Sequence, residues 1–132
     1  MSTKPVYEKL RLRGDMKVAV LNSPGDYRDL TGGLPDGVRI VDESEEKVDF
    51  VHLFVSDQAE LEKFIDVAID TVKYDGLLWV SYPKVSSKVE TDVNRDVLWE
   101  LLKEKGIRPV MQISINETWS ALRFRPAEAV GT

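Results

Sequence analysis

The chain has 132 residues, of which 42% are hydrophobic and 31% are charged, and its formal net charge at pH 7 is −5. This length suits one core, so we expect a single α/β domain over residues 1–132, with a lead-in at 1–13 and a frayed tail at 126–132. The lack of cysteine excludes disulfides, thiolate zinc sites and cysteine nucleophiles. The acidic total argues against nucleic acid as a partner. No apolar run approaches the ~20 residues of a membrane-spanning helix and no signal-peptide core follows Met1, so we expect a cytoplasmic protein without membrane partners.

Apolar runs bounded by turn residues predict six strands, and apolar residues spaced three and four apart predict two amphipathic helices. The run from Leu77 to Tyr82 has no helical spacing and lies between Gly76 and Pro83, which is typical of a strand buried on both faces. In chain order, the strands are expected at 17–22, 38–41, 48–55, 77–82, 107–115 and 118–124, the long helices at 57–73 and 92–105, and short helical turns within 4–12 and 26–30.

Polar residues mark the start of both long helices. Asp57, with Glu60 three residues later, resembles a capping box at the first helix. Thr91 or Asp92 is expected to cap the second helix, which Gly106 ends.

The order of these elements predicts the architecture. Strands that alternate with helices imply parallel βαβ units, whereas the last two strands form an antiparallel hairpin. Pro109 has no amide hydrogen to donate to a ladder, so the fifth strand should lie at a sheet edge. We therefore predict a three-layer α/β fold with a mixed sheet of six strands in the order 2-1-3-4-6-5, strand six antiparallel. This is a Rossmann-type, class I methyltransferase-like arrangement.

Residues 10–22 resemble the lead-in and first strand of class I methyltransferases. The resemblance implies a glycine-rich turn after this strand, where backbone approaches S-adenosylmethionine. Here the turn has one glycine, and Pro24 removes an amide donor. Asn22 and Asp42 are the candidate cofactor-binding residues, because Asp42 follows the second strand, where an acid reaches a ribose hydroxyl. We expect no cofactor, with S-adenosylmethionine as the alternative that the fold leaves open.

Three motifs resemble those of a family of small bacterial proteins of unknown function. They are Tyr-Pro-Lys84-x-Ser-Ser87, Thr91-Asp-x-x-Arg-Asp96 and Asn116-Glu-Thr-Trp-Ser-x-Leu-Arg-Phe124. The resemblance covers nearly the whole chain. It implies the methyltransferase-like α/β fold and a stand-alone domain, and it supplies no activity.

The loop after the fourth strand is the candidate ligand site, because ligands of open α/β sheets bind at the carboxyl ends of strands. Hydroxyls, cations and a helix start converge there, a set that suits a phosphate or a carboxylate. The alternative is structural: the hydroxyl and acid cap the helix, the cations form surface ion pairs, and the tryptophan packs. The candidate residues are Lys84, Ser86, Ser87, Thr91, Asp92, Arg95 and Trp119.

The chain offers no catalytic set and no metal ligands. His52 is the only histidine and lies in mid-strand, so we expect a hydrogen-bonded core or interface residue rather than a base. We therefore predict a non-catalytic α/β module that binds a small anionic ligand or a protein partner at the loop after strand four. The alternatives are a diverged S-adenosylmethionine-dependent methyltransferase-like enzyme and a structural homo-oligomer with Trp99 or the terminal hairpin at its interface.

Overall fold

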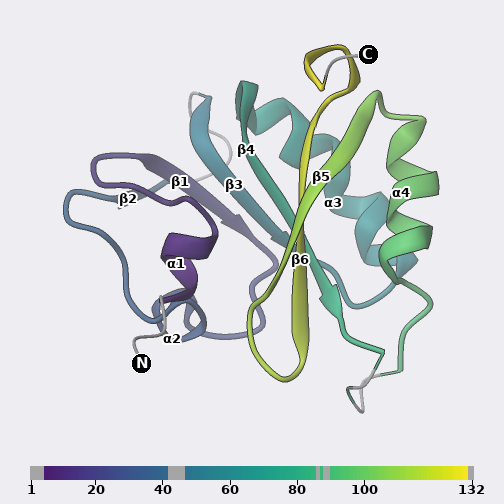
Figure 1. The fold of residues 1–132 in the computed structure, drawn as a ribbon, viewed down its shortest axis with the longest axis horizontal. Helices are drawn as coiled ribbons and strands as arrows, with labels where there is room; N and C mark the ends of the chain where they lie inside the picture. Colours follow the sequence, from purple (N-terminus) through teal and green to yellow (C-terminus); the bar gives the residue numbers. More distant parts are fainter. Residues whose placement is uncertain (1–4, 42–46, 86, 88–89, 131–132) are drawn as a thin grey trace.

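A six-stranded mixed sheet runs through the middle of the molecule (Figure 1). The structure, a computed structural model, describes residues 5–41, 47–85, 87 and 90–130. The strand order is β2-β1-β3-β4-β6-β5; the first four are parallel, and β6 is antiparallel to both neighbours. The predicted order and the antiparallel sixth strand are confirmed. The strands are β1 (Lys17–Leu21), β2 (Arg39–Ile40), β3 (Val48–Phe54), β4 (Val72–Pro83), β5 (Ile107–Ser114) and β6 (Trp119–Pro126).

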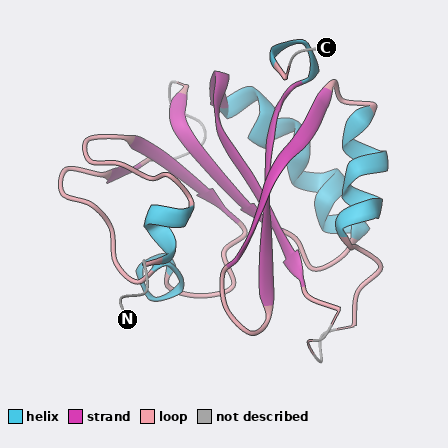
Figure 2. Ribbon diagram, viewed as in Figure 1, coloured by secondary structure: helices cyan, strands magenta, loops and turns pink. Residues whose placement is uncertain are grey.

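Helices cover both faces of the sheet, as the three-layer prediction requires. Figure 2 shows two long helices against one face and two short helices near the N-terminus on the other. Each face has its own apolar cluster, so the sheet is buried from both sides. The indole Nε1 of Trp79 donates to the carbonyl of Leu10 (3.0 Å) and holds the lead-in against the second face. The helices are α1 (Val6–Lys9), α2 (Tyr27–Thr31), α3 (Gln58–Thr71), α4 (Arg95–Lys103) and a 3-10 turn, η1 (Ala127–Ala129).

Strand β4 is central, as predicted, but it begins earlier than the apolar run does. It follows α3 directly at Val72 and contains Gly76 within the strand. A Cβ on Gly76 would lie 2.9 Å from Cγ2 of Val72 and 3.0 Å from the carbonyl oxygen of Lys73, so only glycine lets the chain pass here without a shift. The long, buried second half of β4 pairs with β3 on one side and β6 on the other.

The cap of α3 is confirmed. The Asp57 carboxylate accepts from the Glu60 amide (2.9 Å), and the Glu60 carboxylate accepts from the Ser56 amide (2.6 Å). The first bond satisfies an amide that the first turn of the helix leaves open, and the second ties the residue before the cap to that turn.

The predicted cap of α4 is wrong. The helix starts at Arg95, and the side chain of Asn94 accepts from the Val97 amide (2.9 Å). Asp92 instead accepts from the Gln58 amide (2.9 Å), and Thr91 accepts from the Val93 amide (3.0 Å) in a local turn. Asp92 is thus held by the start of α3, and α4 begins downstream of it at Arg95.

The C-terminal hairpin and tail follow their sequence pattern only in part. Pro109 lies in the edge strand β5, as predicted, and the structure adds a register shift beside it. Pro126 ends β6, and residues 127–129 continue as η1 where a frayed tail was expected. No helix among the described residues is both long enough and apolar enough to span a bilayer.

Candidate functional site

The strand order reverses between β1 and β3, and their carboxyl ends meet at one edge of the sheet. β2 lies on one side of β1 and β3 on the other, which makes this the switch point where open α/β sheets bind ligands. Asn22 directly follows β1 in a left-handed conformation (φ 57°). Its Nδ2 donates to the carbonyl of Phe54 at the end of β3 (2.9 Å), so its amide bridges the two strand ends. Asp42, the other cofactor candidate, lies outside the described residues.

The turn after β1 is held by side chains instead of a run of glycines. The Ser23 hydroxyl donates to the carbonyl of Gly25 (2.7 Å), and Asp26 caps α2 through the Arg28 amide (2.9 Å). A Cβ added to Gly25 would meet no atom within 4 Å, so the backbone of the turn is open to an approaching ligand.

The described loops at this switch point are acidic. Residues 22–26 and 55–57 include Asp26 and Asp57 and contain no lysine or arginine. Such an edge favours a cation or a hydrogen-bond donor over an anion, because opposite charges attract and like charges repel.

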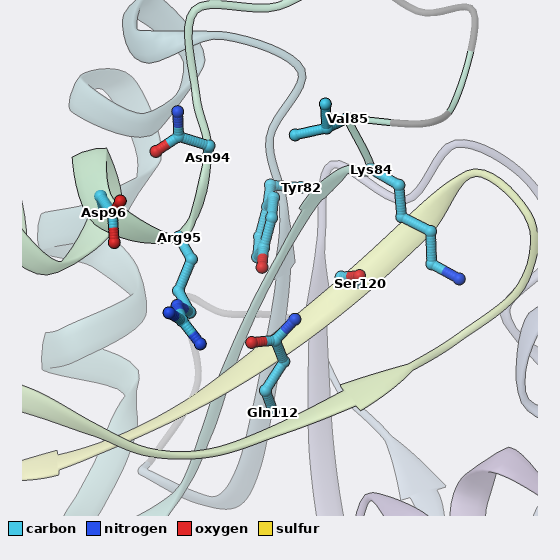
Figure 3. A pocket seen from close by; sticks show the side chains of 8 residues that line it. All are labelled: Tyr82, Lys84, Val85, Asn94, Arg95, Asp96, Gln112 and Ser120. Atoms are coloured by element: carbon cyan, nitrogen blue, oxygen red, sulfur yellow. The ribbon is translucent and has the colours of Figure 1, made fainter.

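A cleft of about 560 Å³ opens beside the carboxyl end of β4 (Figure 3). Two of the predicted site residues, Lys84 and Arg95, lie on its wall. The guanidinium of Arg95 points toward the side chains of Tyr82 and Gln112 and has no hydrogen bond or ion pair within the described part of the chain. Lys84 points the other way, and its Nζ donates to the Ser114 hydroxyl (2.6 Å). The wall comprises Tyr82, Lys84, Val85, Asn94, Arg95, Asp96, Gln112 and Ser120.

The structure gives most of the other predicted site residues structural contacts. The Ser87 hydroxyl donates to the carbonyl of Lys84 (2.7 Å), while Thr91 and Asp92 accept backbone amides. Trp119 is buried, with its ring edge-on to Phe54 at 5.4 Å between centroids. Ser86 lies outside the described residues.

Sequence reasoning missed six residues of the cleft wall, three of which are polar and come from strands. Tyr82 stands in the Tyr-Pro-Lys motif, which was a usable signal. Gln112 and Ser120 are single polar residues in β5 and β6, and only strand pairing brings them to Tyr82. Burial raises the pKa of Tyr82, against the opposing effects of the Arg95 charge and a hydrogen bond with Ser120, so its hydroxyl stays protonated at neutral pH.

His52 lies inside the sheet in a chain of three polar side chains. Tyr27 Oη is 2.7 Å from His52 Nδ1, and Ser81 Oγ is 2.6 Å from Nε2. The imidazole is fully buried and stacks on Phe54 at 4.3 Å. Burial lowers the pKa of His52 to about 3 and raises the pKa of Tyr27, so both are neutral at pH 7. This confirms the predicted hydrogen-bonded core histidine.

A scan of protein-family models and a search of curated proteins both found no match. Solved structures do share the fold. The DhpI–SAH complex has a TM-score of 0.60 at 15% identity, over 92% of this chain and 82% of that chain. A SAM-dependent methyltransferase from Aquifex aeolicus has a TM-score of 0.56 at 15% identity, over 90% and 86%. An rRNA methylase from Streptococcus thermophilus has a TM-score of 0.55 at 10% identity, over 96% and 98%.

These likenesses establish a methyltransferase-like Rossmann fold and correct two predictions. The first prediction was a non-catalytic module that binds an anion or a partner, and the second was that the protein leans away from being an enzyme. Of the three structures, one is described as a SAM-dependent methyltransferase, one as an rRNA methylase and one as a complex with SAH, and these findings favour the alternative of a methyltransferase-like enzyme over both predictions. The described residues contain no cluster of three or more side chains that could hold a metal ion. The strand order and the likeness to these solved structures together show that the chain has a methyltransferase-like α/β fold.

Proposed function

We propose that the chain is a diverged S-adenosylmethionine-dependent methyltransferase-like enzyme. The observation that carries the proposal is the switch point between β1 and β3, which is acidic, free of lysine and arginine in its described loops, and open at Gly25. The solved structures described as a SAM-dependent methyltransferase and as an rRNA methylase support it through their shared fold. The same proposal keeps the other expectations from the sequence. They are the resemblance to a family of small bacterial proteins, the cytoplasmic location, the single domain and the absence of nucleic-acid and membrane partners.

The side chains at the switch point suit this cofactor. S-adenosylmethionine carries a net positive charge at neutral pH, because its ammonium and sulfonium groups outnumber its single carboxylate. These two cations and the ribose hydroxyls seek oxygen acceptors or negative charge. The carboxylates of Asp26 and Asp57 and the carboxamide oxygen of Asn22 would supply them, and Asp42 is a further candidate. When bound, the cofactor supplies an electrophilic methyl group on its sulfonium sulfur.

The cleft after β4 would receive the methyl acceptor. Arg95 is free to bind an anionic group of that molecule, and Lys84 lies on the same wall with its ammonium already hydrogen-bonded. The protonated hydroxyl of Tyr82 and the carboxamide of Gln112 would orient the acceptor as hydrogen-bond partners. Of the predicted ligand residues, Lys84 and Arg95 remain in this proposal.

Calorimetry with S-adenosylmethionine and with S-adenosylhomocysteine tests the cofactor site. The variant Asp26→Asn removes a negative charge while asparagine still caps α2, so folding should be kept. We expect about tenfold weaker binding of S-adenosylmethionine, since hydrogen bonds to a charged group are worth about 1.5–3 kcal/mol. Asp29→Asn, an exposed residue on the same helix, is the matched control and should bind as the parent does. Flat traces with both compounds at millimolar concentration would remove the proposal.

Self-association is a second candidate property. Trp99 is 49% exposed on α4, beside the unpaired edge of β5. An exposed tryptophan at a sheet edge suits an interface with a second copy of this chain. Light scattering of the parent and of Trp99→Ala tests it, and a monomeric mass for the parent at high concentration contradicts it.

A further inference from the structure

A second polar pocket, of about 360 Å³, lies at the opposite edge of the sheet from the switch point. It surrounds the first half of β4 and takes its other walls from the segment before β1 and from β3 and β6. None of its residues belongs to the proposed cofactor site or to the cleft after β4. The wall comprises Arg11, Arg13, Met16, Asp49, Lys73, Tyr74, Asp75, Gly76, Leu77 and Arg123.

Cations outnumber acids on this wall, and partners within the same region occupy the acids. The Asp49 carboxylate accepts from Lys73 (2.9 Å) and from the backbone amide of Lys17 (3.0 Å). Asp75 accepts two hydrogen bonds from Arg125, both of 2.8 Å. These contacts lower the pKa of both carboxyl groups, so both acids are charged and already paired at neutral pH.

Three guanidinium groups on the wall have no such partner. Within the described residues, the side chains of Arg11, Arg13 and Arg123 make no hydrogen bond and no ion pair. They come from the segment before β1 and from β6, which are far apart in the sequence. In a chain with a net charge of −5, three unpaired arginines on one wall are an unusual local excess of positive charge.

Arg123 differs from the other two arginines because one of its nitrogens is buried without a hydrogen-bond partner. Its Nε is the only buried side-chain nitrogen or oxygen without a hydrogen-bond partner among the described residues. The residue lies on β6 between Trp79 of β4 and Met111 of β5, so its side chain leaves from a strand that is paired on both sides. Burial, with the charges of Arg125 and Arg11, lowers the pKa of Arg123, and the negative charge of nearby Asp75 offsets this only in part. A buried donor without an acceptor is costly, and native proteins usually provide the acceptor.

The geometry points to a binding site for a phosphate group in this pocket, held by Arg11, Arg13 and Arg123. A phosphate carries at least three acceptor oxygens and can accept paired hydrogen bonds from planar guanidinium groups, whereas a carboxylate has only two oxygens for three arginines. Such an anion would relieve the repulsion among the cations. The site is independent of the proposed methyltransferase function, because it shares no residue with either of the two sites above.

Thermal unfolding and phosphorus NMR with inorganic phosphate, at constant ionic strength set by chloride, test the site. We expect phosphate to raise the unfolding temperature of the parent and Arg123→Gln to weaken binding about tenfold or more, because one charge-assisted donor pair is lost. Arg28→Gln, an exposed arginine on α2, is the matched control and should bind phosphate as the parent does. If Arg123→Gln does not fold, Arg13→Gln at the exposed rim carries the same prediction.

Adenosine monophosphate is the second probe. Tighter binding than that of inorganic phosphate assigns the site to a nucleotide, and equal binding assigns it to the free anion; both support the inference. No effect of phosphate beyond that of chloride overturns it, as does equal affinity in the parent and in the folded arginine variants. Calorimetry with S-adenosylmethionine on the same samples reports on the proposed function separately.

Discussion

The buried imidazole of His52 should make the stability of the fold depend on pH in a narrow window. The histidine of the unfolded chain takes up a proton as the pH falls through 6.5, whereas burial in the folded protein lowers the pKa to about 3. Between these values the unfolded state binds more protons, so the free energy of unfolding falls as the pH falls. The slope is about 1.4 kcal/mol per pH unit, which gives a loss of about 2 kcal/mol from pH 6.5 to about pH 5.

This window isolates a single group. His52 is the only histidine in the chain, and the carboxyl groups with lowered pKa values, Asp49 and Asp75, contribute mainly below about pH 4. Urea unfolding of the parent and of His52→Gln at a series of pH values measures the effect. The glutamine variant keeps a polar side chain that does not titrate, so its stability should stay nearly level across the window.

Equal pH slopes for the parent and the variant would refute the reasoning, and so would a parent whose stability does not change. Proton NMR of the imidazole gives an answer that does not depend on the variant's folding. The resonance of the His52 ring should stay at its neutral position down to about pH 5, because the folded state takes up no proton there.

Three further substitutions test the packing by urea unfolding. Tyr27→Phe removes the hydroxyl that contacts His52 Nδ1 and should cost about 1–3 kcal/mol, since it leaves a buried polar nitrogen without a partner; an unchanged midpoint would mean that the bond contributes nothing. Asn94→Ala should lower the free energy of unfolding by about 1 kcal/mol, because the cap of α4 is lost. A larger decrease for Thr91→Ala would mean that Thr91 caps the helix, as the sequence predicted. Gly76→Ala should cost about 1–3 kcal/mol, because the new Cβ would lie 2.9 Å from Cγ2 of Val72 in a packed strand; a neutral result would show that this segment shifts freely.

The two edges of the sheet differ in charge, and this difference separates the two proposed sites. The described loops at the carboxyl ends of β1 and β3 carry Asp26 and Asp57 without a cation, which suits a positively charged cofactor. The opposite edge presents Arg11 and Arg123 to a polar pocket, which suits an anion. Ligand charge therefore distinguishes the switch point from the arginine pocket in a binding experiment, since each of these two sites should disfavour the charge that the other binds.

Much of the candidate site could not be predicted from the sequence because its contacts cross the sheet. Lys84 and Arg95 were found, since they flank the loop after the central strand. Gln112 and Ser120 look like ordinary polar residues of strands until pairing brings β5 and β6 beside β4. The carboxylate of Asp92 matched the pattern of a helix cap, yet it accepts a hydrogen bond from the Gln58 amide at the start of α3. No local sequence pattern reveals that contact.

The sequence by itself determined the order and type of the elements and the position of β5 at an edge. These depend on local properties: the spacing of apolar residues, the Asp57 cap and the missing amide hydrogen of Pro109. Only the tertiary structure decided which polar groups meet, as the joining of Arg11 with Arg123 in one pocket shows. The physical reason is that a side chain's partner across a sheet depends on strand register and layer packing, which are settled by the whole core at once.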